Sequence, residues 1–97
     1  MHVTIVIPCY NEAETVPRLI DALDAAEATL RSERRQVEVI LVDDGSRDGS
    51  FEMLRTAAAS RSWMRLIRFR RNFGQTAAMA AGFRAARGDV IIPMDAD

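Results

Sequence analysis

Two aspartates one residue apart, Asp95 and Asp97, end an apolar run and could bind one metal ion. In an extended chain residues i and i+2 point the same way, so both carboxylates could reach a single cation. Carboxylate oxygens suit Mg²⁺ or Mn²⁺, and such ions commonly bridge to the phosphates of a substrate. The pair therefore predicts a divalent-metal site for a phosphorylated substrate, although two aspartates at this spacing form a weak pattern by themselves.

A second acidic pair, Asp43 and Asp44, follows another apolar run and precedes Gly45-Ser46. These residue types favour turns, so the segment could be a turn and nothing more. Polar residues also follow the two remaining apolar runs, at 8–12 and 70–75. If the four runs are strands of one parallel sheet, all these residues lie at one rim, where such sheets bind ligands. That combination is much more specific than either acidic pair.

Four apolar runs alternate with three segments of helical periodicity. The expected strands are 3–7, 37–42, 64–69 and 90–94. The first two are rich in β-branched residues, which is typical of strands covered on both faces. The third alternates apolar and basic residues and is expected nearer an edge.

The expected helices connect these strands. The first begins near Thr15, the second follows Asp48, whose carboxylate can cap it, and the third covers 75–87 and stops at Gly88. The pattern β-α-β-α-β-α-β predicts an α/β fold, a Rossmann-like parallel sheet with right-handed crossovers.

The composition narrows the classes of function. A net charge of −1 gives no reason to expect nucleic acid as a partner. The single cysteine, Cys9, excludes an internal disulfide and a multi-cysteine zinc site, and is most simply a small buried residue. No apolar run approaches the roughly 20 residues of a membrane span, and no signal peptide opens the chain. These features favour a reduced, cytoplasmic setting.

From Val3 to Asp97 the chain resembles the family-2 glycosyltransferases of the GT-A fold. The segments that carry the resemblance are VTIVIPCYNEAETVPRLI, VILVDDGSRDGS and RNFGQTAAMAAGFRAARGDVIIPMDAD. The last is most similar to the branch that transfers sugars to polyisoprenyl phosphates, such as the dolichol-phosphate mannose synthases. The resemblance implies a strand order of 3-2-1-4. It also implies that residues 1–97 are the nucleotide-sugar-binding, N-terminal half of a GT-A domain, truncated at the Asp-x-Asp motif.

The resemblance also implies roles for residues. The nucleotide-sugar-binding positions are Pro8, Tyr10 and Glu12 for the base and ribose, Asp43 with Asp44 for the base, Gln75 near the donor, and Asp95 for the ribose-diphosphate. Asp95 and Asp97 would hold Mg²⁺ or Mn²⁺. The donor would be a UDP- or GDP-sugar and the acceptor a polyisoprenyl phosphate. The general base and the acceptor-binding residues would lie beyond Asp97.

Three further expectations follow from the resemblance. Because the acceptor half is missing, the 97 residues alone should bind metal and donor poorly and should not turn over. The full-length protein should act at the cytoplasmic face of a membrane. The run Val90–Met94 should form an unpaired apolar edge through which the chain self-associates.

Two other interpretations remain. One is a Mg²⁺-dependent phosphate-handling α/β module, related to receiver or phosphatase domains. Against it, the chain has no lysine, and Pro8-Cys9-Tyr10 stands where a phosphatase would have its nucleophilic aspartate. The other is a non-catalytic nucleotide-binding remnant, against which the intact Asp95-Ala96-Asp97 motif argues.

Overall fold

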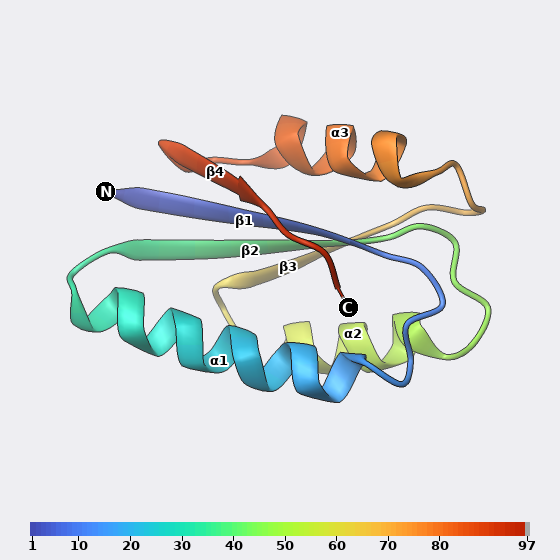
Figure 1. Ribbon diagram of the computed structural model, residues 1–97, viewed down its shortest axis with the longest axis horizontal. Coiled ribbons are helices and arrows are strands. Elements are labelled where there is room, and N and C mark those ends of the chain that lie inside the picture. Colours follow the sequence, from blue (N-terminus) through green and yellow to red (C-terminus); the bar gives the residue numbers. More distant parts are fainter. Residues whose placement is uncertain (97) are drawn as a thin grey trace.

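The computed structural model describes residues 1–96 and contains a four-stranded parallel sheet with three helices (Figure 1). The elements are β1 (His2–Cys9), α1 (Val16–Ser32), β2 (Gln36–Asp43), α2 (Ser50–Ala59), β3 (Met64–Arg68), α3 (Gln75–Ala85) and β4 (Val90–Pro93). The predicted alternation of strands and helices is confirmed. None of the helices within residues 1–96 is long and apolar enough to cross a membrane.

The strand order is β3-β2-β1-β4, as the family resemblance implied. β1 pairs in parallel with β2 on one side and with β4 on the other. The two central strands supply fully buried side chains such as Ile7 and Leu41, which agrees with their β-branched, near-continuous apolar runs. β3, with its alternating basic residues, lies at one edge of the sheet, also as predicted.

The helices cover both faces of the sheet: α1 and α2 lie on one face and α3 on the other (Figure 1). Successive residues of a strand point to opposite faces. In β2, Val39 and Leu41 accordingly belong to the apolar cluster under α1 and α2, whereas Ile40 and Val42 pack with Ala78 of α3. Because both faces of β2 are buried, its backbone, and therefore the position of its carboxyl end, is fixed from both sides.

The third helix ends at Ala85, two residues earlier than the sequence predicted. Ala86 has extended backbone angles, so the helical hydrogen bonding stops there. The next two N–H groups donate to side chains of the sheet, Arg87 to Glu38 (2.7 Å) and Gly88 to Thr4 (2.9 Å). A Cβ atom at position 88 would lie 2.6 Å from the Thr4 hydroxyl oxygen, so this close approach requires glycine.

Glu38 is a buried carboxylate that joins three segments of the chain. It accepts hydrogen bonds from the Thr4 hydroxyl (2.7 Å), the Arg65 guanidinium (2.6 Å) and the Arg87 N–H. Burial alone would raise the pKa of Glu38, but the hydrogen bonds from Arg87, Thr4 and Arg65 outweigh it and hold the pKa below its usual value. The carboxylate therefore fixes the turn between α3 and β4 against the sheet, and with it the start of β4.

We predict that Glu38→Gln lowers the free energy of unfolding by about 2 kcal/mol, because it removes charge-assisted bonds from a buried site. The matched control is Glu52→Gln, which breaks an exposed pair with Arg55 and should cost at most about 0.5 kcal/mol. A depressed pKa in the folded state contributes stability above the usual value of 4.5 that is lost as the pH falls through the folded pKa. When the pH is lowered below 5, the free energy of unfolding measured in urea should therefore fall less in Glu38→Gln than in the unmodified chain. Equal costs for the two variants would contradict this account.

The second edge of the sheet, β4, exposes apolar side chains. Val90, Ile91 and Ile92 are each about 40% exposed, and the far side of β4 has no partner strand within residues 1–96. We predict that the chain self-associates through this edge, since an unpaired apolar strand is a template for pairing. Sedimentation velocity at rising concentration should show dimers or larger species, and Ile91→Lys should reduce them. A monomer at every concentration would contradict the prediction.

Candidate functional site

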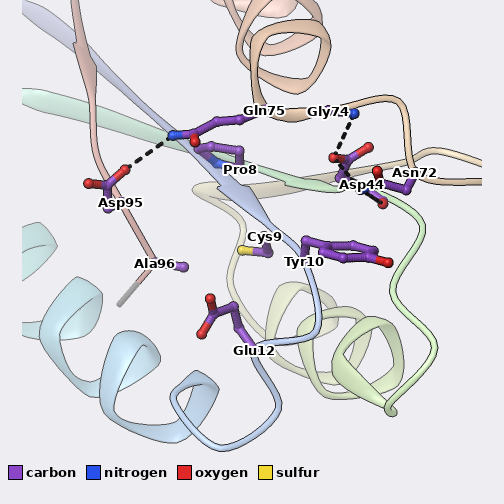
Figure 2. Close-up of a pocket in the computed structure, with 10 residues that line it drawn as sticks. All are labelled: Pro8, Cys9, Tyr10, Glu12, Asp44, Asn72, Gly74, Gln75, Asp95 and Ala96. Atoms are coloured by element: carbon purple, nitrogen blue, oxygen red, sulfur yellow. Dashed lines mark hydrogen bonds between the residues drawn. The ribbon is translucent and has the colours of Figure 1, made fainter.

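A pocket of about 300 Å³ lies at the carboxyl ends of β1, β2 and β4, beside the start of α3 (Figure 2). Its lining residues are Pro8, Cys9, Tyr10, Glu12, Asp44, Asn72, Gly74, Gln75, Asp95 and Ala96. Residues from four separate segments of the chain meet there because parallel strands place their carboxyl ends at one rim. The sheet topology therefore creates the concave site that the sequence pattern predicted.

Six of the predicted site residues line this pocket: Pro8, Tyr10, Glu12, Asp44, Gln75 and Asp95. Asp43 is not among them, because its side chain is fully buried beneath the rim. Asp97, the second predicted metal ligand, lies outside the described residues. Within residues 1–96, no group of three or more histidine, cysteine, aspartate or glutamate residues is placed to hold a metal ion.

The loops that follow β1 and β2 are joined by side-chain hydrogen bonds. The Asn11 N–H donates to the Ser46 hydroxyl (2.8 Å), and the Asn11 side chain accepts from the Arg47 N–H (2.8 Å). The Glu12 N–H donates to the Ser50 hydroxyl (2.9 Å). The positive φ of Asn11, 51°, is one that asparagine tolerates better than most residues. These bonds hold Tyr10 and Glu12 at one side of the pocket.

Asp48 supports the same junction. One of its carboxylate oxygens accepts the Ser50 N–H at the first turn of α2 (3.0 Å), and the other accepts the Ala13 N–H (3.1 Å). The hydrogen bond from the Ser50 hydroxyl is the largest cause of a lowered pKa at Asp48. The predicted contact of Asp48 with the start of the second helix is therefore present at one N–H group, that of Ser50, although Gly49 occupies the cap position itself.

Asp44 fixes the loop between β3 and α3. Its carboxylate accepts hydrogen bonds from the Asn72 side chain (2.9 Å) and from the N–H groups of Phe73 (2.8 Å) and Gly74 (3.0 Å). Gly45 lies against the same loop, because a Cβ atom added there would be 2.3 Å from the Arg71 carbonyl carbon. The β2 carboxyl end therefore positions the loop that delivers Gln75 to the pocket.

Asp43 and Cys9 lie beside each other on paired strands; Cys9 forms part of the pocket floor, whereas Asp43 does not line the pocket. One oxygen of Asp43 accepts the Ser46 N–H (3.3 Å) and so supports the turn that carries Asp44. Its other oxygen, Oδ1, has no hydrogen-bond partner within residues 1–96. Burial, together with the charges of Asp43 and Glu12, raises the pKa of Cys9 to about 12. The thiol therefore stays protonated at neutral pH and is not a nucleophile.

Asp95 is an exposed carboxylate at the end of β4, on the pocket wall. One of its oxygens accepts a hydrogen bond from the Gln75 side-chain amide (3.3 Å; Figure 2). Mg²⁺ and Mn²⁺ prefer oxygen ligands, and Mg²⁺ is usually held by one or two carboxylates together with water and substrate phosphates. An exposed carboxylate beside an open pocket fits that manner of binding, in which water and substrate phosphates complete the coordination.

Four lining residues were not among the predicted site residues: Cys9, Asn72, Gly74 and Ala96. Asn72 and Gly74 belong to the 70–75 segment that was expected at the ligand-binding rim, but no pattern indicated that Asp44 would bind them. That contact joins residues 28 to 30 positions apart. Cys9 was predicted to be buried, and it is, although it also forms part of the pocket floor.

A family model described as Glycosyl transferase family 2 matches residues 4–97. A Pseudomonas fluorescens protein named undecaprenyl-phosphate 4-deoxy-4-formamido-L-arabinose transferase is 50% identical over 96 residues, which is 98% of this chain and 27% of that protein. A Klebsiella pneumoniae protein of the same name is 48% identical and is covered to 28%. The chain thus spans a little over a quarter of the length of these relatives.

Solved structures of similar fold agree with the family match. The mannosyltransferase PcManGT from Pyrobaculum calidifontis, in complex with GDP-Man and Mn²⁺, superimposes with a TM-score of 0.83 at 28% identity. The match covers 98% of this chain and 27% of that one. S. aureus TarS 1–349 in complex with UDP-GlcNAc has a TM-score of 0.80 at 19% identity, again over 27% of its chain, and supports the fold alone.

The close approach of Gly45 to the 71–72 backbone leads to a prediction. Gly45 and Gly49 both have positive φ angles, 77° and 92°, but only Gly45 has neighbours where a Cβ would be. Gly49→Ala should therefore cost only the backbone preference, about 1 kcal/mol, whereas Gly45→Ala should cost about 3 kcal/mol because the loop must move. Thermal and urea unfolding measure both. If the two variants lose equal stability, the loop does not depend on this contact.

Proposed function

This chain belongs to glycosyl transferase family 2, and we propose that it is the donor-binding part of an enzyme that transfers a sugar from a nucleoside diphosphate to a polyisoprenyl phosphate. The observation that carries the proposal is the pocket at the strand ends, where Asp44, Asp95, Glu12 and Tyr10 meet. The names of the Pseudomonas and Klebsiella relatives support a lipid-phosphate acceptor. A lipid acceptor also supports a working position at a membrane surface, for which the cytoplasmic face remains a prediction.

We assign the nucleoside to the part of the pocket formed by β1 and β2. Tyr10 is 43% exposed, and its ring offers an aromatic surface for a base. The Asp44 carboxylate, on the pocket wall, can accept a hydrogen bond from a base N–H. Glu12, on the loop after β1, can accept hydrogen bonds from ribose hydroxyls. We assign Pro8 to the same nucleoside-binding surface. Asp43 is proposed to act beneath it, by holding the turn that carries Asp44.

We assign the diphosphate to the part of the pocket between α3 and β4. Gln75 is the first residue of α3, and the free N–H groups of a helix N-terminus favour an anion. Asp95 faces this region, and its negative charge would repel a phosphate unless a cation were bound there as well. Asp95, with Asp97 as its proposed partner, would hold Mg²⁺ or Mn²⁺ there.

In this proposal the chain binds and stabilises the leaving group of the reaction, which is the nucleoside diphosphate. When the bond between sugar and diphosphate breaks, negative charge accumulates on the diphosphate. A bound divalent ion supplies Lewis-acid stabilisation of that charge. The residues described here orient the donor: Asp44 and Tyr10 fix the nucleoside, and the fixed 72–75 loop sets the direction of the α3 N-terminus.

We predict that Asp95→Asn abolishes most of the activity. The test uses a chimera in which residues 1–97 replace the matching segment of the Pseudomonas fluorescens relative. Transfer of radiolabelled sugar to undecaprenyl phosphate should fall on the order of a hundredfold, with a parallel loss of Mn²⁺ affinity in calorimetry. Asp21→Asn, an exposed change on α1 away from the pocket, should leave both unchanged.

Two results would contradict the proposal. A folded chimera that binds no nucleotide and transfers no sugar would support the interpretation as a non-catalytic remnant. An Asp95→Asn variant with full activity and full Mn²⁺ affinity would remove Asp95 from the metal site while leaving the family assignment intact.

A further inference from the structure

The charges of the chain are unevenly distributed along its sequence. All 14 acidic residues lie outside residues 53–88, whereas eight of the 13 arginines lie within them. Three of the eight form ion pairs with carboxylates of other segments, namely Arg55 with Glu52, Arg61 with Asp24 and Arg65 with Glu38. Three more are close together in residues 68–73, which we call the basic segment: Arg68, Arg70 and Arg71. A local excess of one charge attracts the opposite charge, even where the net charge of the chain is only −1.

The three arginines of the basic segment are exposed and lack acidic partners. Within residues 1–96 none of them pairs with a carboxylate. The guanidinium carbon of Arg68 lies 3.9 Å from the centre of the Phe51 ring. That of Arg71 lies 4.9 Å from the centre of the Phe73 ring. A guanidinium that rests on a ring contacts it through its face, so its in-plane N–H groups can still donate to an anion.

The basic segment also exposes an aromatic ring. Phe73 is 54% exposed, and its ring meets that of Phe69 edge to face, with the ring centres 5.6 Å apart. The backbone at this position is fixed, because the Phe73 N–H donates to the Asp44 carboxylate. Arginines beside exposed aromatic rings are typical of protein surfaces that bind membranes, since the rings enter the interfacial layer and the arginines meet lipid phosphates.

A simpler explanation of these arginines is protection of a sheet edge. Basic side chains on an edge strand prevent a further strand from pairing with it. This explanation suits Arg68, which is the last residue of the edge strand β3. It does not suit Arg70 and Arg71, because they follow the end of the strand. It also gives no reason for the exposed ring of Phe73.

The basic segment adjoins the pocket at the strand ends. Asn72 and Gly74 line that pocket (Figure 2). Arg71 and Phe73, which alternate with them, are exposed and are not among its lining residues. One short loop therefore contributes to the pocket and to the basic surface. A surface in contact with Arg71 and Phe73 would consequently lie beside the pocket.

We infer that the basic segment binds an anionic phospholipid surface, with its three arginines at the headgroup phosphates and the ring of Phe73 in the interfacial layer. The binding does not depend on the proposed function, but its role rests on that function. Contact through this segment would hold the donor pocket beside the membrane that contains the polyisoprenyl phosphate. An acidic peptide would match the arginines, but it would not by itself remove the Phe73 ring from water.

The test is co-sedimentation of the chain with lipid vesicles. Vesicles of phosphatidylglycerol and phosphatidylcholine in equal parts should bind the chain, whereas vesicles of phosphatidylcholine alone should not. Added NaCl should weaken the binding, because salt screens exposed charges. Arg68→Gln combined with Arg70→Gln should lower the affinity about twentyfold, since each arginine near an anionic surface contributes a factor of about five. Phe73→Ala keeps the N–H that Asp44 binds and should lower the affinity severalfold.

The matched control removes the same charge from another exposed site. Arg31→Gln combined with Arg35→Gln changes two arginines near the end of α1, each in an exposed ion pair, and should leave the affinity unchanged. Inorganic phosphate should compete no better than NaCl of equal ionic strength, which separates a lipid surface from a site for free phosphate. If circular dichroism shows that a double variant is unfolded, Arg70→Gln and Arg31→Gln make the same comparison at about fivefold. If the isolated chain does not fold, the chimera carries the same variants.

The outcomes separate this inference from the proposed function. Equal binding to anionic and neutral vesicles, or equal affinities of the two double variants, would overturn the inference and leave the nucleotide pocket in place. Binding to poly-glutamate in preference to the anionic vesicles would also overturn it, in favour of an acidic protein partner. A folded chimera that binds no nucleotide, while the chain still binds vesicles through the basic segment, would overturn the proposed function alone.

Discussion

Parallel pairing of β1 with both β2 and β4 is the constraint on which the rest of this structure depends. It places the carboxyl ends of three strands at one rim, so that Tyr10, Asp44 and Asp95, far apart in the sequence, line a single pocket. A strand buried on both faces cannot shift its register without moving every apolar side chain to the wrong side. The packing of the core therefore determines the geometry of the pocket.

Two buried carboxylates, Glu38 and Asp44, fix the positions of two segments that are not strands. Glu38 fixes the turn between α3 and β4 at the amino ends of the strands, and Asp44 fixes the loop between β3 and α3 at their carboxyl ends. Helix α3 is thus held at both ends by the sheet. Because α3 begins with Gln75, which contacts Asp95, the orientation of the helix determines how the two sides of the pocket face each other.

Much of this arrangement could be predicted from the sequence. The β-branched runs indicated strands covered on both faces, and the alternating basic residues of β3 indicated an edge. The strand order came from the family resemblance, since periodicity cannot decide which strands pair. Asp43 and Asp44 look equivalent in the sequence, yet only the side chain of Asp44 lines the pocket. The end of α3 was placed two residues late because the acceptors for Arg87 and Gly88 lie on distant strands. Such long-range contacts leave no local signal.

The central claim is that one pocket at the strand ends holds both the nucleoside and the metal. Diffraction at the manganese absorption edge, from crystals of the chimera grown with UDP and Mn²⁺, tests it most directly. The account predicts one anomalous peak in direct contact with the Asp95 carboxylate, and a base whose N–H donates to the Asp44 carboxylate. A manganese peak remote from Asp95, or a base bound outside the pocket, would contradict it.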